Sequence, residues 1–495
     1  MASERRYEFG SAAEDETLLA GLRAGQLANV ALGLVLAVLT FRTDSSTSGF
    51  AGAAAVVALA AGAASWHIGG RTIEQWFPVA ARWVVRRVVG RPRHLSTLPL
   101  LGAVGGEIQE PPETLAGVRI LAAAVPGVSS RHIGIVHDGR LGTYAAVLQV
   151  RGRSFQLADT PEKQRRLSAW GAVLAGMARA SSPIHRVQWV QRTVPDDGDA
   201  LGRYLARAVK VPSHHPSLAS YLELVDRAGP TAPQHETFLV VSIAAAKAKH
   251  AIRQTGGGDE GAVKVLLREL SALRRSLAAA EVVVDGVLTP RLLAAAVRTA
   301  FDPNSRAGLA RRAAAAGDEA GTTVSNAWPL ATEATWSAYR TEDVWHATYW
   351  ITQWPRTPVG ADFLAPLLLG TVGMRAVALT MEPVSPHRAH RQVEPQIVKG
   401  QADEELRNRA GFATTARRRR AQEAVARRER ELADGHADYR LAGYVSVTAP
   451  TLEQLETACG EVEQAAQQAF LELRRLHGQQ DLAFTWTLPL GLGLR

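Results

Sequence analysis

The sequence predicts an α+β protein in which an N-terminal two-helix transmembrane hairpin precedes cytoplasmic α+β domains of the ferredoxin-like type. Three observations lead to this prediction. Two long apolar runs lie near the N-terminus, a cluster of arginines follows them, and strand-like and helix-like segments alternate from about residue 100 onward. A chain of 495 residues with 46% hydrophobic side chains is long enough for two or three domains, each with its own core.

The two apolar runs, Leu27 to Phe41 and Phe50 to Ile68, form the predicted hairpin over residues 21–70. A helix that spans a membrane needs about 20 apolar residues, and both runs approach that length. A short polar link joins them, and the alanines and glycines of the second run favour close contact between helices in lipid. Because alanine is only weakly hydrophobic, the alternative interpretation is a buried helical hairpin of a soluble protein.

The charges around the hairpin predict its orientation. Residues 1–20 form a polar tail before the first run, and arginines gather in the segment 71–100 directly after the second. The positive-inside rule places this basic end in the cytoplasm, and two spans return the N-terminus to the same side. We therefore expect a multi-pass protein of the inner (plasma) membrane, with both termini and the bulk of the chain in the cytoplasm.

The basic segment also has the pattern of a helix that lies on a membrane surface. Apolar side chains recur at helical spacing between residues 73 and 88, basic side chains lie opposite, and Pro78 breaks or kinks the helix. A helix packed on its own soluble domain would show the same pattern, so both interpretations stay open. The residues expected at the membrane surface are Arg71, Trp76, Arg82, Trp83, Arg86 and Arg87.

Two α+β units are expected after the basic segment, at residues 101–335 and 336–495, because a Gly-, Ala-, Asn- and Pro-rich stretch at 302–335 indicates a boundary. The turn Asp138-Gly139-Arg140 predicts a β-hairpin between strands 133–137 and 143–150. Further strands are expected at 154–157, 187–194, 236–244, 344–354, 374–383, 439–449 and 481–488, and helices at 160–179, 217–227, 262–280, 290–301, 360–369, 393–434 and 452–477.

No catalytic, cofactor-binding or metal-ligating residues are predicted. The glycine-rich stretch 256–264 misplaces its lysine and lacks the hydroxyl with which a P-loop holds magnesium. His387 and His390 have no further ligands nearby, and one cysteine, Cys459, excludes a disulfide framework or a cysteine-rich metal site. Because no recognisable set of catalytic residues is present, we expect a protein that is not an enzyme and uses no cofactor.

Basic residues offer the other candidate site. The formal net charge is +9, which suits nucleic acid, anionic lipid or an acidic protein. Interleaved glutamates supply partners one helical turn away, and few aromatics are present to stack bases, so sequence-specific nucleic-acid binding is not expected. The residues expected to bind an acidic partner are Arg417, Arg418, Arg419, Arg420, Arg427 and Arg428.

Several segments are distinctive when taken together. They are Gly70-Arg71-Thr72-Ile73-Glu74-Gln75-Trp76-Phe77-Pro78, Ile133-Gly134-Ile135-Val136-His137-Asp138, Val150-Arg151-Gly152-Arg153-Ser154-Phe155 and Ala169-Trp170-Gly171. This set resembles a family of actinobacterial membrane proteins associated with conjugation and type IV secretion gene clusters. In that comparison the hairpin is similar to the PrgI-like two-helix inner-membrane subunit, and the rest is similar to the N-terminal, non-motor region of the secretion ATPase.

The resemblance implies a non-catalytic inner-membrane scaffold of a conjugation-like type IV secretion system. It would contact membrane lipid, dock a separate motor ATPase and other membrane subunits, and be oligomeric within the machine. Residues 336–495 are the expected docking region for the motor. Two other classes remain: a membrane-anchored component of another actinobacterial export machine, such as a type VII-like system, and a membrane-tethered enzyme with an unrecognised site. Gene neighbours would separate the two secretion classes, and a deep pocket with convergent titratable groups would indicate an enzyme.

Overall fold

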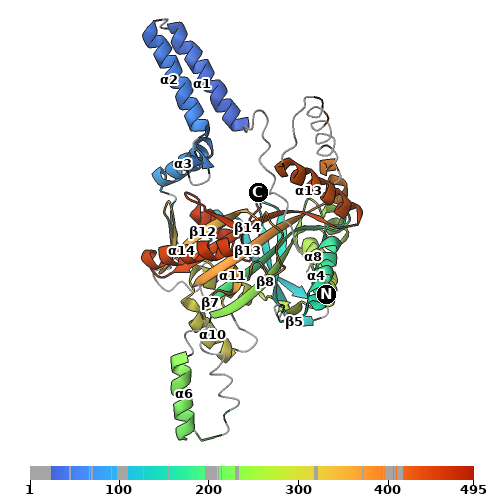
Figure 1. The fold of residues 1–495 in the computed structure, drawn as a ribbon. Coiled ribbons are helices and arrows are strands. Elements are labelled where there is room, and N and C mark those ends of the chain that lie inside the picture. Colours follow the sequence, from blue (N-terminus) through green and yellow to red (C-terminus); the bar gives the residue numbers. More distant parts are fainter. Residues whose placement is uncertain are drawn as a thin grey trace.

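One antiparallel sheet forms the centre of the computed structural model, and helical arms project from it (Figure 1). The N-terminal tail, residues 1–20, lies outside the described residues. The structure describes residues 24–43, 46–65, 67–68, 71–90, 92–96, 110–125, 128–152, 155, 157–195, 209, 211–212, 215–228, 233–316, 321–370, 373–389, 391–393, 395, 405, 409 and 416–494.

The described helices are α1 (Ala24–Thr43), α2 (Thr47–Ser65), α3 (Ile73–Val88), α4 (Thr160–Met177), α6 (Pro216–Ala228), α7 (Lys249–Gln254), α8 (Gly258–Ala279), α9 (Pro290–Phe301), α10 (Ser305–Ala316), α11 (Ala365–Leu369), α13 (Ala416–Ala433), α14 (Leu452–Gln468) and α15 (Gln480–Thr485). The strands of the sheet are β3 (Arg93–Leu95), β4 (Val118–Val125), β5 (Val128–Asp138), β6 (Thr143–Arg151), β7 (Ile184–Pro195), β8 (Pro233–Ala244), β9 (Val283–Val287), β10 (Ala331–Ala334), β11 (Tyr339–Thr341), β12 (Val344–Gln353), β13 (Met374–Val384), β14 (Asp438–Ala449) and β15 (Glu472–Arg475). A separate two-stranded ribbon consists of β1 (His67–Ile68) and β2 (Arg71–Thr72).

The sheet has two halves with the same strand order, which meet where β7 pairs with β13. In the first half β7 pairs with β8, β8 with β6, and β6 with both β5 and β9; in the second, β13 pairs with β14, β14 with β12, and β12 with both β11 and β15. Val190 faces Ala378 at the junction, and their outer neighbours are Phe238 and Tyr444 respectively. This repeated strand order indicates an internal structural duplication whose two copies meet at the antiparallel pairing of β7 with β13.

Helices cover both faces of this sheet. α4 and α8 pack on the first half, and α14 and α11 pack on the same face of the second half. The opposite face is covered by α9, by α15 and by the C-terminal segment 488–494. Val190, Val240 and Ala378 lie beneath this second layer, so the C-terminal segment crosses the junction between the halves. The core is thus continuous through both predicted α+β units.

Local sequence signals account for several elements. Asp138 closes the β5–β6 hairpin by accepting hydrogen bonds from the backbone N–H groups of Arg140 and Leu141, at 2.9 and 3.2 Å. The side chain of Asp159 caps α4, which has proline in its first turn, and that of Thr451 caps α14. The predicted hairpin and the predicted helices beginning near residues 160 and 452 are confirmed. α14 nevertheless ends at Gln468 rather than near 477, because β15 follows and pairs with β12.

The transmembrane assignment of the N-terminal hairpin is wrong for the residues that the structure describes, since no helix among them is long and apolar enough to cross a membrane. α1 and α2 lie side by side as a hairpin (Figure 1). The apolar stretch of α1 between Gln26 and Arg42 covers about 22 Å at about 1.5 Å per residue, whereas a hydrocarbon core is about 30 Å thick. α2 ends at Ser65, so the second apolar run is divided between a helix and strand β1.

The expectation of separate ferredoxin-like sheets is wrong as well, because β13 pairs with β7 from Arg375–Thr193 through Met381–Val187. The last predicted strand, 481–488, is instead α15 followed by an irregular segment. The Gln480 side chain explains this difference. Its amide accepts from the backbone N–H of Thr348 at 2.7 Å and donates to the Thr348 carbonyl at 3.3 Å, so a side chain ends the ladder that a further strand would have continued.

Candidate interaction surfaces

Helix α3 lies between the hairpin and the body (Figure 1), and its inner face is fixed by a cluster of aromatic rings. Trp336, in the turn between β10 and β11, has its ring centroid 5.7 Å from that of Trp76 and 5.2 Å, edge-on, from that of Trp83. Gly478 completes the contact with φ of 72°; a Cβ there would lie 2.7 Å from the Trp336 ring and 3.1 Å from Val79. A side chain at this position would displace the Trp336 ring and press on Val79 of α3, and the positive φ also favours glycine.

An ion pair adds to the aromatic contact. Arg86 donates from Nη2 to Oδ2 of Asp481 at 2.6 Å, and the Asp481 side chain is almost completely buried. Burial lowers the pKa of Arg86, but the hydrogen bond and the charge of Asp481 outweigh it and raise the pKa above its ordinary value. Arg86 is therefore directed at the body of the protein and holds α3 in one orientation.

The outer face of α3 carries large apolar side chains in solvent. Phe77 is 74% exposed, Val84 51%, Val85 60% and Val88 80%. At 100° per residue these four positions share one side of the helix, opposite Arg86. Of the six residues expected at a membrane surface, Trp76, Trp83 and Arg86 thus belong to the inner contact. Arg82 and Arg87 are exposed, with the Arg87 guanidinium 5.1 Å from the Trp83 ring, and the Arg71 side chain lies outside the described residues.

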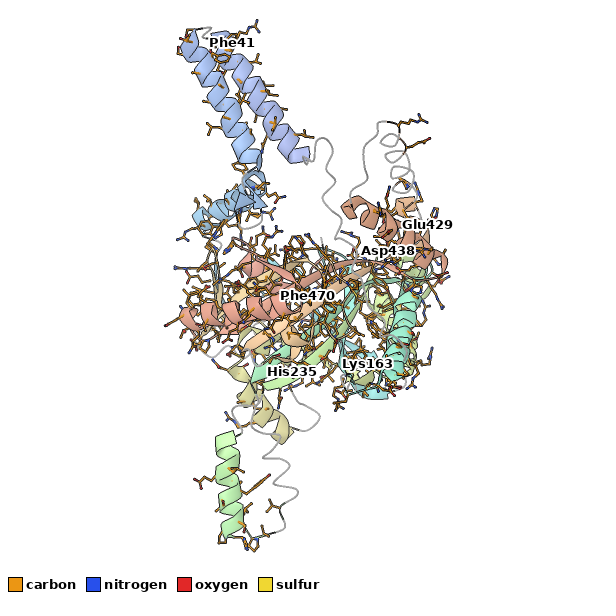
Figure 2. The ribbon with its side chains drawn as sticks, viewed as in Figure 1. Phe41, Lys163, His235, Glu429, Asp438 and Phe470 are labelled. Atoms are coloured by element: carbon orange, nitrogen blue, oxygen red, sulfur yellow. The ribbon has the colours of Figure 1, made fainter. Side chains whose placement is uncertain are left out.

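The arginine-rich helix α13 is inserted between β13 and β14 and lies at the edge of the body (Figure 1). Arg419 and Arg427 are exposed, as are Glu423 and Glu429. Arg428, by contrast, pairs with Asp438 at the start of β14 with a separation of 2.5 Å, and Figure 2 marks Asp438 beside this helix. The side chains of Arg417, Arg418 and Arg420 lie outside the described residues, although their backbone belongs to the helix.

Two further helical elements expose apolar side chains. In the hairpin, Gly33 and Ala37 face the interior, whereas most leucines and valines of α1 are exposed, and Phe41 lies at the end far from the body (Figure 2). Helix α6, in the connection between β7 and β8, exposes Tyr221 and Leu222. Because β7–β8 and β13–β14 occupy equivalent places in the two halves, α6 and α13 are equivalent insertions.

Two of the residues considered for chemistry, Lys264 and Cys459, are occupied by structural contacts. Lys264 pairs with Glu260 one turn away on α8 at 2.7 Å. Cys459 is buried in α14, where desolvation raises the pKa of its thiol. His387 is exposed, and His390 lies outside the described residues. Within the described part of the chain, no three His, Cys, Asp or Glu side chains are grouped to hold a metal ion.

One cavity of about 220 Å³ lies between α9, α10 and the segment before β10. Its base is formed by Arg298, which donates to Glu342 at 3.0 Å and to Asp302 at 3.2 Å, so its charge is compensated. The rim includes Arg312 and Asn326, both exposed. The ion pair between Arg298 and Glu342 links α9 to the second half of the sheet. The cavity therefore belongs to the packing between these two parts.

Sequence reasoning missed the residues that position α3. Trp336, His477 and Asp481 lie far along the chain from α3, and nothing in their local sequence indicates that they meet it. The exposed apolar stripe did have a signal, because Phe77, Val84 and Val88 repeat at the spacing of successive helical turns.

Comparison with known proteins gives one family. Residues 231–351 match a family model described as "Putative type VII ESX secretion system translocon, EccE". The matched residues run from the start of β8 into β12 and so include strands from both halves of the sheet. No curated protein matches the chain. The family match supports a secretion-system component, and it gives no support to the resemblance to the type IV, PrgI-like family.

Proposed function

We propose that this protein is a non-catalytic, membrane-associated component of a type VII-like secretion translocon. The observation that carries the proposal is the match of residues 231–351 to the EccE model. The matched segment lies within the central sheet, to which it supplies β8, β9, β10, β11 and most of β12. The exposed helical elements at its periphery favour a role in holding other components of the machine, and the same match implies association with such components.

The main experiment is a deletion of the gene in its host, followed by measurement of type VII substrates in the culture medium. We expect export to fall and to recover when the full-length protein is supplied. A conjugation assay on the same deletion strain measures DNA transfer and tests the type IV alternative. Unchanged export together with lost DNA transfer would refute the type VII assignment and favour the conjugation class.

The sequence led us to expect docking of a separate motor ATPase, and we propose that helix α13 is the docking surface. Exposed arginines on this helix would attract an acidic partner surface, mainly by speeding its association. The double substitution Arg419→Glu with Arg427→Glu should reduce co-purification of the partner. Arg274→Glu with Arg275→Glu on exposed positions of α8 makes the same charge change elsewhere and serves as the control. Equal capture by both variants would place the docking surface on another element.

A non-catalytic role also predicts that the purified protein does not turn over nucleotide. Phosphate binding of the P-loop kind needs a glycine-rich turn, a positioned lysine and a metal-binding hydroxyl. Lys264 is instead paired with Glu260 on α8. Nucleotide hydrolysis that follows the protein through purification and disappears in a point variant would refute this part of the proposal.

A further inference from the structure

The outer face of α3 combines three properties. It carries a continuous apolar stripe, it is flanked by cations, and its orientation is fixed from the other side by contacts with the body. Each property rests on separate observations, and together they identify the chemistry of a partner. The first is the exposure of Phe77, Val84 and Val88, each more than half exposed.

The cations lie on both sides of this stripe. At 100° per residue, Arg82 projects about 140° from Phe77 in one direction and Arg87 about 80° in the other. Both are exposed. An apolar stripe bordered by arginines on either side matches a surface that is apolar at depth and anionic at its boundary, as a bilayer with anionic headgroups is. Long arginine side chains reach such headgroups while their stems cover apolar surface.

The inner contact prevents α3 from turning this stripe inward. Trp76 and Trp83 pack on Trp336, and Arg86 is paired with Asp481. Rotating the helix to bury Val84 and Val88 would break the buried ion pair and expose two tryptophans. The fold thus holds the apolar stripe outward, and an exposed apolar patch rimmed by polar residues marks an interaction surface.

From this geometry we infer that the outer face of α3 binds the surface of an anionic membrane, with Phe77, Val84 and Val88 in the boundary between headgroups and acyl chains and with Arg82 and Arg87 on the headgroups. The inference reassigns the sequence-based membrane-surface set. Trp76, Trp83 and Arg86 orient the helix, and the lipid contact is made by residues on its other side. This lipid contact does not depend on the secretion role.

The test uses full-length protein and flotation with vesicles of phosphatidylcholine, with or without phosphatidylglycerol. We expect binding to the vesicles that contain phosphatidylglycerol, and Val84→Glu with Val88→Glu should weaken it by at least about tenfold, because two charges would enter the apolar boundary. Leu141→Glu with Leu157→Glu is the matched control. Both control leucines are more than half exposed, and they lie in the β5–β6 turn and before α4. This control should bind like the unmodified protein.

A second variant tests the charges. Arg82→Gln with Arg87→Gln keeps the apolar stripe and should reduce the preference for phosphatidylglycerol and the sensitivity of binding to salt. Circular dichroism should be unchanged in every variant, since all substituted side chains are exposed. Undiminished flotation of the Val84→Glu, Val88→Glu variant would overturn the inference. So would equal binding to both kinds of vesicle, or association of that stripe with a second copy or another protein in the absence of lipid.

Discussion

At the scale of single residues, the buried polar side chains explain why the two halves form one body. Arg186 on β7 donates to the carbonyls of Gly491 and Leu494 at 3.0 and 2.8 Å, and Gln188 accepts from the Gly491 N–H at 2.8 Å. On the neighbouring strand, Thr380 donates to the Leu492 carbonyl at 2.9 Å. These side chains satisfy the backbone of the C-terminal segment, which forms no strand of its own.

His346 makes a testable contribution to stability. It is fully buried between Thr341, 2.7 Å from Nε2, and Thr448, 2.8 Å from Nδ1. Desolvation lowers its pKa from 6.5 to about 3, so the folded protein keeps the imidazole neutral. In the unfolded chain the same group takes up a proton below about pH 6.5. The contribution of neutral His346 to the free energy of unfolding is therefore complete above about pH 6.5 and is lost progressively as the pH falls toward 3.

We expect the free energy of unfolding to fall with decreasing pH more steeply in the unmodified protein than in His346→Gln. The difference in slope should approach about 1.4 kcal/mol per pH unit below pH 6. Denaturant titrations of both proteins between pH 7 and 4.5 measure it. Parallel pH dependences would show that His346 does not resist protonation in the folded state.

At the scale of elements, the sequence predicted what local signals control. The β5–β6 hairpin followed from the turn at Asp138, and α4 and α14 lie where helices were expected at 160–179 and 452–477. Apolar periodicity also predicted the helix now seen as α3. It did not distinguish the face that packs on Trp336 from the face left exposed, because both faces are apolar or aromatic. That choice depends on residues more than two hundred positions away in the chain.

The attachment of α3 gives an element-scale prediction. Asp481→Ala should remove the shorter of the two ion pairs of Arg86, leave only Glu113 at 3.8 Å, and lower the free energy of unfolding by roughly 1–3 kcal/mol. Hydrogen exchange should accelerate in α3 first, because the ion pair links this helix to the body. Glu333→Ala removes the partner of Arg93, whose side chain is 71% exposed, and should have a much smaller effect. Unchanged exchange in α3 of the Asp481 variant would show that the Arg86–Asp481 pair is not needed to fix the helix.

At the scale of the whole molecule, the duplication was not predictable from the sequence. The two halves share their strand order but not the side chains at the junction, where Val190 pairs with Phe238 in one half and Ala378 pairs with Tyr444 in the other. The division into units 101–335 and 336–495 followed changes of composition along the chain. Composition does not reveal which strands pair, and here β13 pairs with β7 across that division. Pairing between distant strands is set by the packing of complete faces, which a single sequence leaves open.

The shared sheet predicts that the two halves unfold together. Deleting residues 336–495 would remove β11–β15, leave β7 without its partner β13, and remove the C-terminal segment that covers Val190 and Val240. We therefore expect this truncation to aggregate rather than to lose one partner selectively, which makes surface substitutions on α13 the better probe of docking. In the intact protein, calorimetry should show one transition for the sheet, with calorimetric and van't Hoff enthalpies in agreement. Two resolved transitions, one of them retained in the fragment 101–335, would show that the β7–β13 pairing does not couple the halves. Agreement of the enthalpies would instead make the duplicated sheet a single cooperative platform from which the α3, α6 and α13 surfaces are presented.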